Sequence, residues 1–388
     1  MMRNISIGID MGSSTTRVVV GEFLKGEKNP KIIGVGEAET KGVRHGYVVN
    51  FNDAVNSVKN AVSMAEKSSG GIKIKKAVVS INSITLRSEI NSGSTTITKA
   101  NNEVTNLDIK KAIEESENTL NLVNRKIIQM FPVSFKLDGK EVHGKAEGMH
   151  GNKLEVKILF ITCSTQHLDD LLAILAETGI ETVDVTASSI AGSYLALTEK
   201  QKIVGSALVN IGFETVSLCI FENGIPVYLH TFSIGSSDIT NDIALGFKIP
   251  LENAESLKIK NDAEKSIKKK LDEMIEARLS DIFELIENHL KKIKRNELLP
   301  AGVVFIGGGA SIPKLEELSK SFLKLPSKIA TTEFFGNIKT KLRDPAWFVV
   351  LGLVISSKNS QDNSTDSLHN IFKDTKNSIK SILKQLMP

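Results

Sequence analysis

Three short turns, far apart in the chain, carry residue types that could bind the phosphates of a nucleotide. The first reads "DMGSST": Asp10 ends an apolar run, Gly12 allows a tight turn, and Ser13, Ser14 and Thr15 follow. Backbone amides and hydroxyl groups presented in this way form a concave site for an anion. The first turn therefore predicts a phosphate cradle.

The other two turns differ from the first in their residues. "NIGFET" has Asn210 and Gly212, but bulky Phe213 and negative Glu214 stand where a phosphate turn favours small residues. "IGGGASIP" has consecutive glycines that let a backbone approach a ligand closely before a helix; they are Gly307, Gly308 and Gly309. Any one turn is also consistent with a hairpin that has a convenient glycine. Three in this order are far more specific.

Several other classes of site are excluded or disfavoured. The pattern GxxxxGK[ST] is absent, so the protein is not a P-loop nucleotide-binding protein. Cys163 and Cys219 lie inside apolar runs and are expected to be buried thiols in a reducing cytoplasm. The histidines show no zinc-ligand spacing. We also expect no signal peptide and no transmembrane segment, since no apolar run reaches about 18 residues.

The elements that would position the turns form two similar halves. The chain of 388 residues, 41% hydrophobic and 24% charged with a net charge of +4, suffices for two or three domains or one bilobed molecule. Residues 5–23 read as two strands joined by the first turn, and residues 206–224 have the same layout. A second half therefore begins near Ile203, as a weak internal duplication.

Helical patterns and one insertion separate these hairpins. Helices are predicted at 51–67, 164–179, 237–245, 251–258 and 263–294, and late in the chain within "PAWFVVLGLVIS". Gly179 is expected to terminate the second of them. Residues 82–162 have a different, more polar texture and are predicted to be a small inserted α/β unit.

The C-terminal stretch has the pattern of a basic amphipathic helix behind a polar linker. Its apolar residues follow helical spacing, namely Leu368, Ile371, Phe372, Ile379, Ile382, Leu383 and Leu386. Its lysines lie off that face, namely Lys373, Lys376, Lys380 and Lys384. This pattern predicts a membrane-surface anchor. The alternative is a helix that docks on a protein groove.

The order of these elements resembles the actin-like ATPases, and within them the FtsA family of bacterial cell-division proteins. The matching text includes "GVGEAETKGVRHGYVVN", "GMHGNKLEVKILFITC", "SSDITNDIALGF" and "MIEARLSDIFELI", and it extends over most of residues 5–355. PilM, a pilus-assembly protein, is the alternative with the same insertion, but it is not expected to end in an amphipathic tail. Sugar kinases and chaperones of this fold would need a substrate-cleft aspartate or a peptide-binding domain, and neither is seen.

The resemblance implies a bilobed α/β actin-like fold with an FtsA-type inserted subdomain. Its expected parts are subdomain 1A (1–81 and 163–202), inserted subdomain 1C (82–162), subdomain 2A (203–237 and 295–355), subdomain 2B (238–294), a disordered linker (356–367) and an amphipathic membrane-targeting helix (368–388).

The resemblance also implies roles for single residues. Asp10 would hold hydrated Mg²⁺, and the hairpins around Gly12 and Gly212 would grip the phosphates of ATP or ADP. Glu255 and Lys258 would lie beside the ribose and adenine; by spacing alone they could be a surface ion pair. The implied partners are other copies in a filament, the FtsZ C-terminal peptide at about 239–294, other division proteins and membrane lipids at the septum, with no nucleic acid.

The second turn departs from the family pattern and predicts slow or absent hydrolysis. Asn210 replaces an aspartate that would place Mg²⁺ and water, and Ser188 stands near the place of a water-orienting carboxylate in some relatives. Phe213 and Glu214 replace glycines, and where such a glycine has a positive φ the replacement would cost backbone strain. A Glu214 carboxylate about 4 Å from a phosphate would be repelled by about 4 kcal/mol per charge pair. We assign no catalytic residue.

Overall fold

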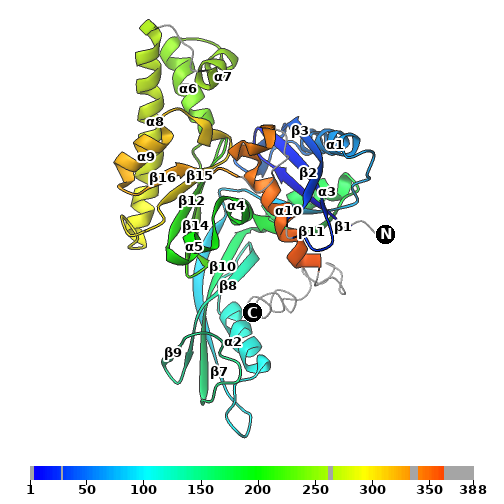
Figure 1. Cartoon of the computed structure of the whole chain (residues 1–388), viewed down its shortest axis with the longest axis vertical. Coiled ribbons are helices and arrows are strands. Elements are labelled where there is room, and N and C mark those ends of the chain that lie inside the picture. Colours follow the sequence, from blue (N-terminus) through cyan, green and yellow to red (C-terminus); the bar gives the residue numbers. More distant parts are fainter. Residues whose placement is uncertain (1–3, 28, 261–264, 333–339, 362–388) are drawn as a thin grey trace.

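The computed structural model describes residues 4–27, 29–260, 265–332 and 340–361, and shows two lobes built on the same strand order (Figure 1). The first-lobe sheet has the order β11-β6-β1-β2-β3. Its strands are β1 (Asn4–Met11), β2 (Thr15–Phe23), β3 (Lys31–Glu39), β6 (Lys76–Ile81) and β11 (Glu181–Ala187). A small hairpin, β4 (Val43–Arg44) and β5 (Tyr47–Val48), follows β3.

The second-lobe sheet repeats this arrangement in the order β16-β15-β12-β13-β14. Its strands are β12 (Ser206–Ile211), β13 (Val216–Glu222), β14 (Ile225–Phe232), β15 (Val303–Ile306) and β16 (Ser327–Ile329). In both sheets an antiparallel hairpin lies beside a parallel strand, β1 beside β6 and β12 beside β15. The predicted internal duplication is therefore confirmed.

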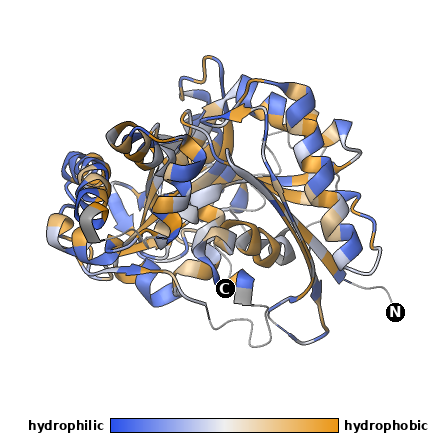
Figure 2. Cartoon of the chain, turned by 90° about the horizontal axis from the view of Figure 1, so that it is seen from above, coloured by the Kyte–Doolittle hydropathy of each residue, from blue (hydrophilic) through white to orange (hydrophobic). Residues whose placement is uncertain are grey.

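Helices cover both sheets and join them. The first lobe contains α1 (Phe51–Ser68), α3 (Thr165–Glu177), α4 (Ser188–Ala196) and α10 (Phe348–Gln361), and α5 (Glu199–Val204) packs on β13 of the second-lobe sheet. Helix α4 contacts β11 and β6 of one sheet and β12 and β13 of the other, and α10 packs on α4. One apolar core accordingly includes residues of both lobes, such as Val79 and Leu208. Hydrophobic residues predominate in these central elements (Figure 2).

A separate core lies between the second-lobe sheet and its outer helices. These helices are α6 (Ser236–Phe247), α7 (Leu251–Lys260), α8 (Lys265–Lys292) and α9 (Leu315–Leu323). Helix α8 buries residues at helical spacing against α6 and α9, including Leu271, Ile275, Leu279, Ile282 and Ile286. Short 3₁₀ turns lie at Gly308–Ser311, Thr340–Arg343 and Pro345–Trp347.

The inserted unit extends away from the two lobes (Figure 1). It comprises β7 (Arg87–Thr96), α2 (Asn106–Asn118), β8 (Arg125–Leu137), β9 (Lys140–Val142) and β10 (Lys153–Ser164) around a core of its own. Although inserted into the first lobe in sequence, it continues the second-lobe sheet. Its strand β7 pairs with β14 through Arg87 and His230, which gives a nine-stranded sheet.

One boundary differs from expectation. The linker was expected from residue 356, but α10 continues to Gln361, because Ser357 is buried and its hydroxyl donates to the Val354 carbonyl at 2.8 Å and contacts the Ser6 hydroxyl. The predicted amphipathic residues 368–388 lie outside the described part of the chain. Among the described helices, none combines the length and the apolar character that crossing a bilayer requires.

Candidate functional site

A cavity of about 390 Å³ lies between the lobes, within the size range of small-molecule sites. All residues predicted to bind a cofactor line it, namely Asp10, Gly12, Ser13, Ser14, Thr15, Asn210, Gly212, Glu255, Lys258, Gly307, Gly308 and Gly309. These residues come from both hairpins, from α7 and from the glycine turn after β15. The fold thus brings together segments that are about 300 residues apart in the chain.

The two hairpins have matching geometry. The Gly12 amide donates to the Thr15 carbonyl at 3.2 Å, and the Gly212 amide donates to the Thr215 carbonyl at 2.8 Å. A Cβ atom at either glycine would lie 3.0 Å from that carbonyl oxygen. Glycine is therefore required by close approach of the backbone. Asp10 pairs across its hairpin with Arg17, and Asn210 occupies the same register in the other.

Asp10 is the only carboxylate that the first hairpin contributes to the cavity, among the residues that the structure describes. Its side chain is 8% exposed and accepts a hydrogen bond from the Ser80 hydroxyl at 2.5 Å. Burial raises its pKa, and the Ser80 hydrogen bond and the Arg17 charge partly offset this rise. Such a carboxylate gains by acquiring a bound positive charge.

Arg17 also lines the cavity, although the sequence did not indicate it as a site residue. Its guanidinium pairs with Glu37 at 3.1 Å and lies 5.5 Å from the centre of the Trp347 ring. Its Nε is buried without a hydrogen-bond partner in the described structure. A cation is thereby fixed beside the first hairpin, where it can balance anionic charge.

The glycine turn is shaped by Gly307. Its φ of +91° is in the left-handed region, and its amide donates to the Pro345 carbonyl at 3.1 Å. A Cβ atom there would strike the Asn210 side chain and the Ile211 carbonyl. A Cβ atom at Gly308 would meet nothing within 4 Å. Gly307 therefore holds the turn against the second hairpin, while Gly308 leaves open space.

Glu255 and Lys258 form a partly buried pair on α7. Lys258 is 5% exposed, and its Nζ lies 2.7 Å from the Glu255 carboxylate. The same Nζ donates to the Ser236 carbonyl at 2.9 Å and to the Thr240 hydroxyl at 2.8 Å. Burial lowers the Lys258 pKa, and Glu255 partly offsets this. The alternative of a surface ion pair is wrong, because the lysine ties α7 to α6 beside the cavity.

The second turn does not direct Glu214 at the cavity, so the arrangement that would repel a phosphate does not occur. The Glu214 side chain is 4% exposed, accepts from the His45 amide at 2.7 Å and pairs with the Arg44 guanidinium. The residue is not among those that line the cavity. Its partners lie in the first lobe, about 170 residues earlier in the chain.

The expected backbone strain at the second turn is also absent. Neither Phe213 nor Glu214 has a positive φ. The carbonyls of Gly212 and Phe213 accept from the amides of Ser236 and Ser237 at 3.0 and 2.7 Å. These bonds from the first turn of α6 hold the turn in a conformation open to any residue. Phe213 itself lines the cavity.

Several further residues reach the cavity without having been predicted, including Asn82, Thr215, Ser236, Ser311 and Asp344. Of these residues, Asn82 could most easily have been predicted from the sequence. It directly follows β6, a parallel strand, and ligands of α/β sheets lie at the carboxyl ends of such strands. Ser188, by contrast, is 1% exposed and does not line the cavity.

A metal bound by protein groups alone has no support in the described residues, since no cluster of at least three His, Cys, Asp or Glu side chains occurs among them. The cavity offers some oxygen donors, namely Asp10, Asn210, Ser13 and Ser14. These could supply only a few of the oxygen ligands that Mg²⁺ requires. A cation there would need further ligands from water or from a bound phosphate.

Comparisons with known proteins agree with this architecture. A family model described as "Cell division protein FtsA" matches residues 207–352, and one described as "SHS2 domain inserted in FTSA" matches residues 83–162. Together these models match more than half of the chain. The chain belongs to the FtsA family of the actin-like ATPase superfamily.

Curated FtsA proteins match along nearly the whole chain. The FtsA protein of Bacillus subtilis is 27% identical, over 90% of this chain and 82% of its own length. That of Borreliella burgdorferi is 27% identical, over 99% of this chain and 98% of its own length. The family assignment therefore applies to both lobes and the insert, and it identifies a cell-division protein.

Solved structures show the same fold. A PilM–PilN type IV pilus biogenesis complex has a chain with a TM-score of 0.68 at 17% identity, covering 90% of this chain and 97% of its own. MreB5 of Spiroplasma citri bound to ADP has a TM-score of 0.54 at 13% identity, covering 93% and 99%. At these identities the likeness concerns the fold alone.

Proposed function

We propose that this FtsA-family protein binds ATP or ADP in the interlobe cavity, forms filaments under the cytoplasmic membrane and tethers FtsZ filaments to it at the division septum. The observation that carries the nucleotide part is the convergence of every predicted binding residue on one cavity. In the structural neighbours, MreB5 is described as bound to ADP and to AMPPNP.

Different residues are assigned to different parts of the nucleotide. The turns at Gly12 and Gly212 cradle phosphate oxygens, and Arg17 balances part of their charge. Gly308 leaves room for a close approach of the nucleotide to the backbone. The Glu255–Lys258 pair lies toward the ribose and adenine, where the glutamate carboxylate is 34% exposed and free to accept from a hydroxyl.

Mg²⁺ would enter with the nucleotide. It would supply positive charge that neutralises the phosphates. Asp10 would hold it, because its buried carboxylate gains from a nearby cation. Asn210 in the matching register would contribute only an uncharged amide, so the second lobe would hold the ion weakly.

The residues at these positions favour a protein that binds ATP without cleaving it efficiently. The side chain opposite Asp10 is the amide of Asn210, Glu214 is turned to the first lobe, and Ser188 is buried away from the cavity. Asn210 and Ser188, which stand where the resemblance places carboxylates that act on Mg²⁺ and water, therefore carry no negative charge. We expect turnover far below that of an active ATPase, with nucleotide serving as a structural ligand for polymerisation.

Membrane attachment and FtsZ binding rest on the sequence. The amphipathic residues 368–388 follow α10, and each lysine near an anionic leaflet contributes about 1 kcal/mol. FtsZ is proposed to bind, through its C-terminal peptide, the helices of the second lobe from Ile239 to Lys294. A filament carries many tails, so many weak contacts with lipid act together and the attachment becomes firm.

Electron microscopy of the full chain on lipid monolayers, with and without Mg-ATP, tests this proposal. Filaments that form with ATP and recruit a fluorescent FtsZ C-terminal peptide are expected. The Gly308→Ala variant should keep the fold but form fewer filaments, if nucleotide occupancy supports assembly. Complete absence of filaments from wild-type protein on lipid under both conditions would refute the polymer proposal.

A pilus-assembly platform is the second candidate, because the PilM–PilN structure has the higher TM-score of the two neighbours described. Both FtsA family models and the curated relatives favour cell division. Fluorescence anisotropy with an FtsZ C-terminal peptide and with peptides of a PilN protein separates them. Binding of only the PilN peptides would favour the pilus function.

A further inference from the structure

The hairpin β4–β5 of the first lobe reaches the second turn of the other lobe beside the cavity, and no binding role accounts for it. We propose that this hairpin and residues 213–215 form an interlobe latch that holds the two phosphate turns at a fixed separation before any ligand binds. The latch is defined by Arg44 and His45 on one side and Glu214 on the other, with Asn82 and Thr215 as a second contact.

The hairpin is built to present one backbone amide. Arg44 pairs with Tyr47, and the two residues between them, His45 and Gly46, have φ of +49° and +84°. Positive φ at both central positions defines a type I′ turn, the tightest hairpin connection. A non-glycine residue in this region costs free energy, so the conformation at His45 has to be held by its surroundings.

The same hairpin is anchored firmly in its own lobe. A Cβ atom on Gly46 would lie 2.7 Å from the Ser83 Cα, so the turn packs directly on the chain after β6. The Tyr47 ring meets the His167 ring edge-on with centroids 3.6 Å apart. The position of His45 is therefore set by the first lobe and not by a flexible loop.

The contacts across the cleft are polar and converge on one carboxylate. Glu214 accepts from the His45 amide at 2.7 Å and pairs with the Arg44 guanidinium. The Glu214 carbonyl accepts from His45 Nδ1 at 3.0 Å. Beside them, Asn82 Nδ2 donates to the Thr215 hydroxyl at 2.9 Å. Charge-assisted bonds of this kind are stronger than neutral ones.

Because the latch lies beside the cavity, it affects the geometry of the cavity. Phe213 and Thr215 of the latched turn line the cavity, as does Asn82 of the first lobe, whereas Glu214 does not. Fixing this turn against the first lobe fixes the distance between the two hairpins. The apparent affinity for a ligand falls with the fraction of molecules that are in an open state. A protein already held in its binding-competent arrangement avoids this loss.

Distance measurements between spin labels test the latch without nucleotide, so the outcome does not depend on the proposed function. Labels are placed at Lys59→Cys on α1 and Glu252→Cys on α7, both exposed, while native Cys163 and Cys219 are buried. In the unliganded full chain we expect one narrow distance distribution. Glu214→Ala should broaden it toward longer distances, with the open population raised at least about tenfold.

Arg44→Ala provides a second variant, because its side chain is 67% exposed and its loss does not threaten folding. It should broaden the distribution in the same direction, and the double variant should add little to Glu214→Ala. Glu222→Ala is the matched control, since Glu222 pairs with Arg295 inside the second lobe. A broad distribution in the wild type, or a narrow one in both Glu214→Ala and Arg44→Ala, would overturn the proposal.

Discussion

Gly307 and Gly308 are adjacent in the cavity wall but are needed for different reasons. Gly307 has a positive φ and packs against Asn210 and Ile211. Gly308 has neither constraint. The first is required by the fold, and the second leaves space that a ligand can fill.

Gly307→Ala is therefore expected to lower the free energy of unfolding by about 2 to 4 kcal/mol, through a left-handed alanine and backbone overlap. Gly308→Ala should change it by less than about 0.5 kcal/mol. Urea unfolding of both variants measures the difference. Equal effects would show that the turn is not constrained at Gly307.

Gly308→Ala should in addition weaken Mg-ATP binding by about tenfold or more, because the new methyl group occupies the space proposed for the nucleotide. Isothermal titration calorimetry measures the affinity. Unchanged ATP affinity in this folded variant would remove the glycine turn from the binding site.

His230 gives the stability a defined pH dependence. Burial, with the charges of Lys292 and Arg87 and the neighbouring His289, lowers its pKa to about 4. Its ordinary value is 6.5, so the unfolded chain takes up a proton first, and stability is lost as pH falls from about 6.5 to about 4. Relative to His230→Gln, the wild type should lose about 1 to 2 kcal/mol over this range, since the side chain is only partly buried. Urea titrations at pH 7 and pH 4.5 measure it.

Asp184 gives the stability the opposite pH dependence over about the same pH range. Burial raises its pKa to about 6 from 3.8, so the folded protein takes up the proton first and gains stability as pH falls from about 6 to about 4. Asp184→Asn removes this gain. Each group is therefore measured against its own variant. If both variants follow the wild type at every pH, neither pKa is shifted.

The residues that line the cavity could be predicted from sequence because three glycine-containing turns occur in the order typical of the actin-like fold, although each turn alone is ambiguous. The direction of Glu214 could not. Its partners, Arg44 and His45, lie in another lobe, and no local pattern links residues so distant. Arg17 was missed because an arginine within a strand is usually a solvated surface residue.

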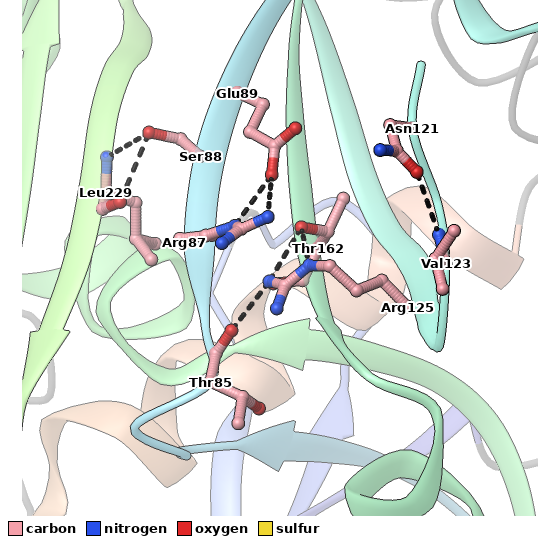
Figure 3. Close-up of polar contacts among 9 residues, drawn as sticks. All are labelled: Thr85, Arg87, Ser88, Glu89, Asn121, Val123, Arg125, Thr162 and Leu229. Carbon is pink, nitrogen blue, oxygen red and sulfur yellow. Dashed lines mark hydrogen bonds and ion pairs between the residues drawn. The ribbon is translucent and has the colours of Figure 1, made fainter.

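At the scale of elements, polar contacts as well as apolar packing of β8 and β10 join the insert to the lobes, and Figure 3 shows the polar contacts. The Arg125 guanidinium, at the start of β8, donates to the Thr85 carbonyl at 2.7 Å and to the Thr162 carbonyl at 3.0 Å. Thr85 precedes β7 and Thr162 lies in β10, so one side chain ties the strands that enter and leave the insert. The Ser88 hydroxyl joins β7 to the backbone of Leu229 on β14.

Arg125→Gln should therefore loosen this junction by about 2 to 4 kcal/mol, because partly buried carbonyls lose a charged donor. Hydrogen exchange should rise in β7 and β10 and remain unchanged in β1 and β2. Arg87→Gln is the control, since Arg87 is 50% exposed and pairs only with neighbouring Glu89 among its recorded ion pairs. Equal protection in both variants would contradict a role for Arg125 as the junction.

Periodicity predicted most helices and the duplication of the hairpins, because apolar spacing reports directly on buried faces. It did not show that the insert continues the second-lobe sheet. The strand pairing there consists of one pair, His230 with Arg87, and a single pair leaves no pattern in either strand.

At the scale of the whole molecule, the chain has a folded body followed by residues 362–388, which carry the proposed anchor. Because α10 extends to Gln361 and Ser357 is buried, a truncation after Gln361 removes the proposed anchor and keeps the whole of α10. The truncated protein should no longer sediment with anionic vesicles, while its thermal unfolding stays within about 1 °C of the full chain. Continued sedimentation would show that another surface binds lipid.

The central claim is that the interlobe cavity holds ATP and seldom cleaves it. The most direct measurement is the identity of the nucleotide bound to the full chain after incubation with Mg-ATP and vesicles, resolved by anion-exchange chromatography over time. We predict about one bound nucleotide per chain, recovered mainly as ATP. Recovery of no nucleotide, or rapid release of ADP and phosphate in repeated turnovers, would contradict it.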